Sequence, residues 1–238
     1  MKKIIFFDTE TTGNETKDFL CQIAYKVEDE TFEGLYKPPF KVPPEASAVH
    51  HISNKMLDGK PSFKDSGDLE KVKELFEDEN SVVVAHNAPF DLMIIEKEGI
   101  VPKQFICTLR VARHLDADEK IDRYNLQYLR YLLDLDVQAQ AHDALGDVLV
   151  LEQLFHRLLK KIMDQDSITE HEAVEEMIEI SSHPSIFKKL NFGKHKGKRI
   201  EDVVKEDRGW LEWLYAEKVK SDVLDEDWIY TLKHYLQK

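Results

Sequence analysis

The chain has few cysteines and no long apolar run among its 238 residues. Its two cysteines, Cys21 and Cys107, fit no common zinc spacing and provide no disulfide framework. No segment approaches the roughly 20 consecutive apolar residues that span a bilayer. The apolar run at residues 4–7 is too short for the core of a signal peptide. These absences exclude a disulfide-rich or membrane-spanning class and predict a cytoplasmic protein.

Positive charge is also scarce, because 33 lysines and arginines face 46 aspartates and glutamates, for a net charge of −13. A nucleic-acid partner normally requires a positive surface. However, a carboxylate cluster that binds cations is negative until those cations arrive. One acid-free basic stretch, which alone is typical of a solvated loop, contains Lys188, Lys189, Lys194, Lys196, Lys198 and Arg199. The charge balance therefore does not exclude nucleic acid.

Strand patterns come first in the chain and then alternate with helix patterns. Residues 2–7 are apolar on both faces and predict a buried central strand, as do residues 81–85. Between them, residues 19–27 and 31–36 predict a hairpin. Apolar spacing predicts helices over 66–77, about 89–98, 108–115, 125–133, 144–163 and 169–180. This order predicts an α/β fold with a mixed sheet flanked by helices.

The helical pattern breaks at residues 181–185, where we expect a domain boundary. Residues 1–182 then form the first domain, with a core over about 1–165 and a trailing helix. Residues 186–238 predict a small α+β unit with a basic hairpin at 190–200 and two helices. Its core is expected to contain the aromatic residues Trp210, Trp213, Tyr215, Trp228, Tyr230 and Tyr235.

Acidic residues stand where the two buried strands end. Asp8 and Glu10 follow the first strand, and alternate residues of an extended chain project to the same side. Charges beside an apolar run are costly to desolvate unless they are paired or hold a metal. Asp91 follows the second strand at a helix start, where an aspartate also favours the helix dipole.

A third acidic position lies at the start of the predicted long helix. His142 precedes this helix, Asp143 is its expected N-cap, and Asp147 falls in its early turns near the buried edge. Four carboxylates and a histidine suit phosphodiester hydrolysis with two metal ions. Mg²⁺ prefers carboxylate oxygens, and two ions about 4 Å apart can hold the attacking and leaving oxygens. A histidine can accept the proton of the attacking water.

Taken together, the hexapeptides at 8–13, 86–91 and 142–147 resemble the three motifs of the DEDDh 3′–5′ exonucleases, which have a ribonuclease H-like fold. Supporting stretches at 22–24, 108–110 and 125–126 extend the resemblance over about residues 1–165. The sister subclass carries Tyr-x3-Asp in its third motif. Here Tyr25 and Asp29 have that spacing, but they precede the second motif and are excluded. Residues 191–200 resemble the small C-terminal domain of exonuclease X-like proteins.

The resemblance implies two Mg²⁺ or Mn²⁺ ions held by Asp8, Glu10, Asp91 and Asp147, with His142 activating the attacking water. The main chain over Thr9, Thr11 and Thr12 would lie near the terminal 3′-hydroxyl. Phe90 would stack on the terminal base or belong to the core, and Asn87 would contact substrate or cap its helix. The expected contacts to the phosphate backbone are Lys194, Lys196, Lys198 and Arg199. By contrast, His50, His51 and His86 are expected to be structural, because hard cations prefer oxygen.

The function implied is release of nucleoside 5′-monophosphates from the 3′ end of nucleic acid, with DNA favoured over RNA. Two alternatives are an inactive nucleic-acid-binding protein and a proofreading subunit of a polymerase. The complete set of Asp8, Glu10, Asp91, His142 and Asp147 argues against the first. A basic, aromatic C-terminal segment that forms its own unit argues against the second. The preference for single strands or duplexes stays open.

Overall fold

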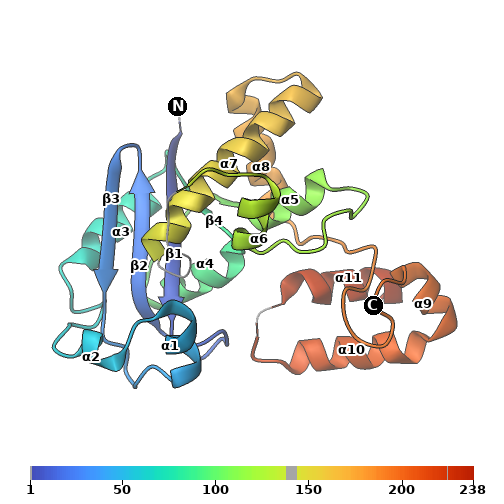
Figure 1. Cartoon of the computed structure of the whole chain (residues 1–238), viewed down its shortest axis with the longest axis horizontal. Coiled ribbons are helices and arrows are strands. Elements are labelled where there is room, and N and C mark those ends of the chain that lie inside the picture. The colour runs from blue at the N-terminus through green and yellow to red at the C-terminus, as the bar shows by residue number, and fades with distance from the viewer. Residues whose placement is uncertain (1, 138–143, 224) are drawn as a thin grey trace.

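A mixed β-sheet forms the centre of the molecule. The computed structural model describes residues 2–137, 144–223 and 225–238, and within these ranges five strands form one sheet in the order β3-β2-β1-β4-β5 (Figure 1). Strand β1 (Lys3–Thr11) pairs antiparallel with β2 (Leu20–Val27) and parallel with β4 (Ser81–Ala85). Strands β3 (Glu30–Leu35) and β5 (Phe105–Cys107) form the two edges. The predicted mixed sheet is confirmed.

Helices cover both faces of the sheet. One face packs against α5 (Thr108–Leu115), α6 (Leu126–Leu132), α7 (Ala144–Asp166) and α8 (Glu170–Ser182), and the other against α3 (Asp68–Glu77) and α4 (Ala88–Lys97). The side chains of β1 alternate between the two cores. Phe6 belongs to the α7 side and lies 5.2 Å from Phe155, ring centre to ring centre, whereas Ile5 and Phe7 belong to the α4 side. By the same alternation, residues 8 and 10 project toward α7.

Local signals in the sequence set several helix ends. Helix α4 has proline in its first turn and is followed by Gly99, whose φ is 86°. Helix α8 opens with the predicted capping box between Thr169 and Glu172. The sequence did not predict β5, or the two short helices α1 (Pro44–His50) and α2 (Asn54–Leu57) that follow the proline-rich loop.

The C-terminal unit is more helical than predicted. It contains α9 (Ile200–Glu206), α10 (Arg208–Lys220) and α11 (Glu226–Leu236), so one helix was missed. The expected basic hairpin consists, in the described part of the chain, of a single antiparallel bridge between Lys189 and Arg199. Two glycines with positive φ turn the chain back before strands can extend. Its separate core contains Leu190, Ile200, Val203, Leu211, Leu214, Trp228, Leu232 and Leu236.

Two further features bear on the class of protein. None of the described helices has the length and apolar character that a membrane span requires. Cys21 and Cys107 are both free thiols in the core. Burial raises the pKa of Cys21 to about 12, so this thiol is unreactive near neutral pH.

Candidate active site

Three of the four predicted acidic residues meet at one end of the sheet. Asp8 and Glu10 reach this point from β1, and Asp147 reaches it from the first turn of α7. Each offers a carboxylate oxygen, and these oxygens lie within 4.8 Å of one another. Oxygen atoms at this spacing are the ligand type that Mg²⁺ and Mn²⁺ prefer. The cluster therefore fits a divalent cation by its donor chemistry.

The packing of α7 aims Asp147 at the strand. Val148 and Leu151 on α7 enter the core, which leaves Asp147 at the edge facing β1 with only 9% exposure. Gln127 on α6 donates from Nε2 to Asp147 Oδ1 at 2.5 Å. Further along α7, Glu152 accepts both of its hydrogen bonds from Lys26 of β2, at 2.5 and 2.6 Å. These contacts fix α7 relative to the sheet, and with it the position of Asp147.

Asp91 lies on the other side of β1. It is 4% exposed, and its Oδ1 accepts hydrogen bonds from Thr9 Oγ1 at 2.6 Å and Thr9 N at 3.2 Å. Burial raises the pKa of Asp91 to about 7, although the bonds from Thr9 oppose this shift. Among the described residues, the group of carboxylates within 4.8 Å contains Asp8, Glu10 and Asp147, so Asp91 is held next to the cluster rather than within it.

The threonines that follow Asp8 are engaged within the protein. Thr11 Oγ1 donates to the Gly13 carbonyl, and Thr12 Oγ1 donates to Asp18 Oδ1 at 2.7 Å. Thr12 also exchanges two hydrogen bonds with Phe19, because Thr12 N donates to the Phe19 carbonyl and Phe19 N donates to Thr12 Oγ1. The N–H groups of Thr9 and Thr12 therefore have internal acceptors. The position of the main chain over Thr9, Thr11 and Thr12 near the terminal 3′-hydroxyl stays a prediction.

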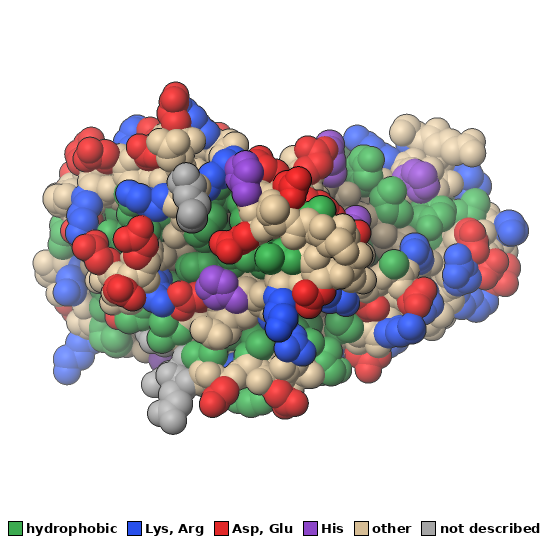
Figure 2. Space-filling model, turned by 90° about the horizontal axis from the view of Figure 1, so that it is seen from above, with side chains coloured by type: hydrophobic (Ala, Val, Ile, Leu, Met, Phe, Trp, Pro, Cys, Tyr) green, Lys and Arg blue, Asp and Glu red, His purple; other side chains and the backbone are tan. Residues whose placement is uncertain are grey.

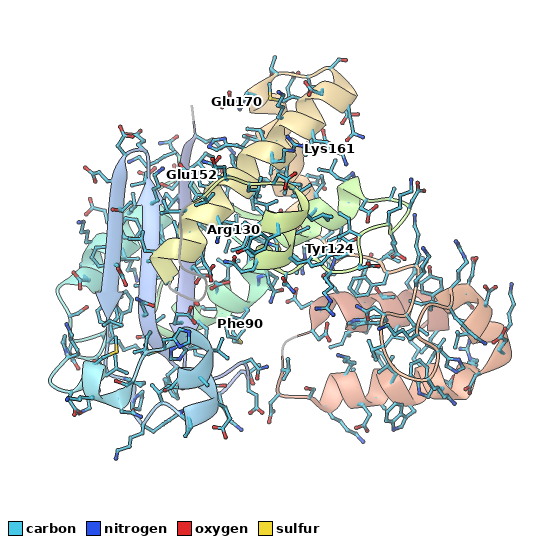
Figure 3. All side chains as sticks on the ribbon, in the orientation of Figure 1. Phe90, Tyr124, Arg130, Glu152, Lys161 and Glu170 are labelled. Atoms are coloured by element: carbon cyan, nitrogen blue, oxygen red, sulfur yellow. The ribbon has the colours of Figure 1, made fainter. Side chains whose placement is uncertain are left out.

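Asn87 and Phe90 lie at the start of α4. Asn87 adopts the left-handed conformation, with φ 68° and ψ 42°, and its exposed side chain makes no capping hydrogen bond. Asn87 thus occupies the N-cap position of α4 without a side-chain cap, and its contact with substrate stays a prediction. Phe90 is half-buried and packs against the core on the α4 side. Figure 3 places Phe90 beside the lower end of β1, on the side of the C-terminal unit.

Two of the predicted structural histidines are held by hydrogen bonds. The Nε2 of His86 lies 2.6 Å from the Tyr124 carbonyl, and its Nδ1 lies 2.9 Å from Thr108 Oγ1. Because a carbonyl only accepts, Nε2 carries the proton. Burial lowers the pKa of His86 to about 4. The buried His50 accepts the Ile52 N–H at Nδ1. His142 and Asp143 lie outside the described residues.

The basic residues predicted to contact phosphates are mostly paired with nearby acids. Lys194 Nζ lies 2.6 Å from Asp207, Lys198 Nζ lies 2.5 Å from Glu206, and Arg199 Nε lies 2.6 Å from Glu201. Within the described ranges, the exposed Lys196 has no such ion pair. Figure 2 shows basic and acidic side chains interspersed over the C-terminal unit, at the right of the view. The basic stretch therefore does not form one continuous positive surface.

Two residues of the site went unnoticed in the sequence. Gln127 binds Asp147, and its only signal is its place in the first turn of the helix that Asn125 caps. Asp18 orders the turn after β1, and a Cβ added to Gly13 would lie 2.5 Å from its Oδ2. Asp18 lies five residues beyond the first motif.

Comparisons with known proteins agree with this geometry. The Exonuclease family model matches residues 5–155, and the Exodeoxyribonuclease X-like C-terminal model matches residues 190–219. Exodeoxyribonuclease 10 of Escherichia coli is 31% identical over 207 residues, which cover 85% of this chain and 83% of the relative. DNA polymerase III subunit epsilon of Treponema pallidum is 31% identical over 166 residues, which cover 64% of this chain and 74% of the relative.

A solved structure supports the same assignment. The chain resembles exonuclease X in complex with 5′ overhanging duplex DNA, with a TM-score of 0.58 and 26% identity. The match covers 75% of this chain and 99% of the solved one. The ribonuclease H-like fold that the motifs implied is thereby confirmed. The family match over residues 5–155 and the 31% identical relative show that this chain belongs to the exonuclease family, whose members are nucleases.

Proposed function

We propose that this protein is a 3′–5′ exonuclease that releases nucleoside 5′-monophosphates from DNA. The observation that carries the proposal is the convergence of Asp8, Glu10 and Asp147 within 4.8 Å at the end of β1. Two relatives support DNA as the substrate. One is named an exodeoxyribonuclease, and the solved exonuclease X is bound to a duplex with a 5′ overhang, which is a duplex with a recessed 3′ end.

Two Mg²⁺ or Mn²⁺ ions are the proposed cofactors. Asp8, Glu10 and Asp147 would hold the first ion, and Asp8 and Asp91 the second. When bound, such ions neutralise charge on the scissile phosphate and lower the pKa of water. Hydrogen bonds from Thr9 hold Asp91 in place, and burial raises its pKa to about 7. A nearby cation would favour its ionised form.

The remaining roles fall to residues around the carboxylates. His142 accepts a proton from the attacking water, which suits a side chain that titrates near neutral pH. The ring of Phe90 lies against the terminal base, since its half-buried position leaves part of the ring uncovered. Asn87 offers an exposed amide at the same end of the sheet. The main chain at Thr11 lies near the terminal sugar.

The C-terminal unit is proposed to contact the DNA backbone through Lys194, Lys196, Lys198 and Arg199. Residues 186–238 carry 12 lysines and arginines and 10 aspartates and glutamates, so the unit is net positive in a chain of −13. Exposed ion pairs contribute only about 0–1 kcal/mol. Phosphates can therefore replace the acidic partners at little cost.

The test is digestion of a 5′-labelled single-stranded DNA oligonucleotide with Mg²⁺, with Mn²⁺ and with a chelator. The expected result is a metal-dependent ladder that shortens from the 3′ end and is absent with Asp8→Ala. Parallel digestions of RNA and of duplex ends define the preferred substrate. Absence of cleavage on every substrate and with every metal would favour the inactive nucleic-acid-binding protein.

A second candidate is a proofreading subunit, which the similarity to DNA polymerase III subunit epsilon favours. The match of residues 190–219 to the exonuclease X-like C-terminal family favours an independent nuclease. Purification of the tagged full-length chain from its host distinguishes the two, because a proofreading subunit brings a polymerase with it. We place the activity in the cytoplasm, where buried free thiols such as Cys21 and Cys107 stay reduced.

A further inference from the structure

The turn that follows β1 is built around Asp18. Asp18 Oδ2 accepts the Glu15 N–H at 2.8 Å, and Asp18 N donates to the Glu15 carbonyl at 3.0 Å. These bonds define a four-residue turn over 15–18. Because Asp18 also binds Thr12 Oγ1, a displacement of this turn moves Thr12, which lies two residues beyond Glu10. We refer to residues 12–19 as the β1–β2 loop.

The C-terminal unit pairs with this loop through the main chain. Thr16 N donates to the Asp222 carbonyl at 2.7 Å, and Glu15 and Val223 form an antiparallel bridge. The partner segment is the connection between α10 and α11. Figure 1 shows this connection approaching the loop below β1, at the inner end of the C-terminal unit. Two stretches far apart in sequence thus form a small ladder at the β1–β2 loop.

The connection is held in place by a partly buried ion-pair cluster around Arg110. Arg110 of α5 is 4% exposed; its Nε lies 3.2 Å from Asp227 Oδ1 and its Nη2 lies 2.8 Å from Glu226 Oε2. Arg113 also pairs with Asp227, and Arg110 Nη1 donates to the Ser181 carbonyl at 2.8 Å. Because Arg110 itself is buried, losing the acids that face it would leave a buried charge uncompensated, which is strongly destabilising. The first turn of α11 is therefore fixed on α5, directly after the segment that meets Thr16.

The first residues of the C-terminal unit are fixed as well. Lys188 N donates to Glu119 Oε1 at 2.6 Å, and Phe187 N donates to Thr231 Oγ1 at 3.0 Å. The guanidinium of Arg113 lies 4.5 Å from the centre of the Phe187 ring. The unit is thus attached at its first residues, at α11 and at the β1–β2 loop, and these contacts restrain it relative to the sheet.

We propose that the connection between α10 and α11 braces the β1–β2 loop, so that the C-terminal unit positions the catalytic main chain as well as binding DNA. Thr16 is the positioning residue, since its N–H joins the two segments. The brace acts through Asp18 on Thr12 and so on the strand end that carries Glu10. This inference rests on the proposed function, which puts the terminal sugar near the main chain at Thr11.

The first test is Thr16→Pro, with Thr16→Ala as the matched control. Thr16 is the second residue of the turn over 15–18, a position that proline favours. Proline there removes the N–H that Asp222 accepts and keeps the turn, whereas alanine keeps the N–H. The expected result is a kcat about tenfold lower in the proline variant, the scale of a modest misplacement of reacting groups, with KM for single-stranded DNA changed less than twofold. Equal kcat values in the two variants would overturn the brace.

The second test locks the contact with a disulfide in Glu15→Cys/Val223→Cys. Opposed residues of an antiparallel pair have Cα atoms about 4.5–5.5 Å apart, which suits a disulfide, and the native cysteines are buried. The oxidised enzyme is expected to cleave as fast as the reduced enzyme and to restore kcat when combined with Thr16→Pro. A reversible loss of activity on oxidation would mean that the segments must separate during turnover, which contradicts a brace.

Amide hydrogen exchange distinguishes failure of the brace from failure of the proposed nuclease. The Thr16 amide of the wild-type chain is expected to be protected from exchange, whether or not the chain cleaves DNA. Rapid exchange at Thr16 would overturn the brace even if the enzyme is active. A protected Thr16 in a chain that cleaves no DNA would instead support the contact and contradict the proposed function.

Discussion

The carboxylates at the end of β1 and the basic stretch of the C-terminal unit are both charged clusters, but they are arranged in opposite ways. Asp8, Glu10 and Asp147 come from two separate elements and converge within 4.8 Å. The lysines and arginine at 194–199 are close in sequence, and three of the four pair with acids of their own unit. The comparison teaches that like charges brought together by the fold indicate a site, whereas like charges adjacent in sequence need not.

The physical cause lies in the local backbone. A strand sends alternate side chains to the same side, so Asp8 and Glu10 must project together once Phe6 is buried. The basic stretch instead turns at Gly193 and Gly197, whose φ values are 69° and 86°, and its side chains spread toward different acids.

The strongest test of this comparison is neutralisation of one charge in each cluster. Asp147→Asn is expected to lower kcat by more than about 10³-fold, because electrostatic stabilisation at the reacting phosphate is lost, while the melting temperature stays near wild type. Lys198→Ala removes one exposed ion pair and is expected to change kcat less than twofold. Comparable losses of kcat in the two variants would contradict the distinction between the two clusters.

Removal of the proposed base extends the comparison to a neutral residue. His142→Ala is expected to lower kcat by about 10²–10⁴-fold, the usual effect of losing general base catalysis. Mn²⁺ binding, followed by titration calorimetry, is expected to stay within twofold of wild type. A loss of Mn²⁺ binding would make His142 a metal ligand rather than a base.

The pH dependence of folding sharpens the contrast between a partly buried histidine and an exposed one. Burial lowers the pKa of His86 to about 4, below its value of 6.5 in the unfolded chain. As pH falls from about 6.5 to about 4, the unfolded chain binds a proton that the folded protein does not. Stability of the order of 3 kcal/mol is therefore lost in this window.

Urea unfolding at pH 7 and pH 5 measures this effect. His86→Gln is expected to be less stable than wild type at pH 7 and to lose less stability on acidification. The matched control is His183→Gln, since the His183 side chain is 71% exposed, and its pH dependence should follow wild type. A wild-type slope in His86→Gln would contradict the neutral state of the partly buried His86.

The smallest expected effect concerns the DNA contact of the C-terminal unit. Lys196→Ala is expected to raise KM for single-stranded DNA about two- to threefold and to reduce the slope of log KM against log salt by about 0.7, as for one lost phosphate contact. Lys205→Ala, another exposed lysine in the unit, is the control. A change confined to kcat would place Lys196 outside the DNA contact.

Much of the fold was predictable because its signals are local. The apolar runs at the start of β1 and in β4 need no other part of the chain to be recognised, and Thr169 and Glu172 form their capping box within four residues. Strand β5 has only three residues, too few to show a period, and it is a strand because β4 pairs with it. The short helices α1 and α2 lack a period for the same reason.

The residues of the site also divide into those with a local signal in the sequence and those without one. Asp8, Glu10 and Asp147 were predictable because each stands at the end or start of an element with a clear pattern. The roles of Gln127 and Asp18 depend on hydrogen bonds to residues that only the folded chain brings near. Asn87 does occupy the N-cap position of α4, but residue type alone could not reveal its left-handed backbone and the lack of a capping hydrogen bond from its side chain.

The contact between Thr16 and Asp222 joins an N–H to a carbonyl, and neither side chain takes part in it. Selection on this contact therefore acts on the path of the backbone rather than on residue identity. Residues 16, 222 and 223 can drift among most amino acids over evolutionary time while the ladder persists. A proline at position 16, or an insertion in the connection between α10 and α11, would remove this contact in a single mutation. Related chains can thus share this contact without sharing a recognisable motif at either end of it.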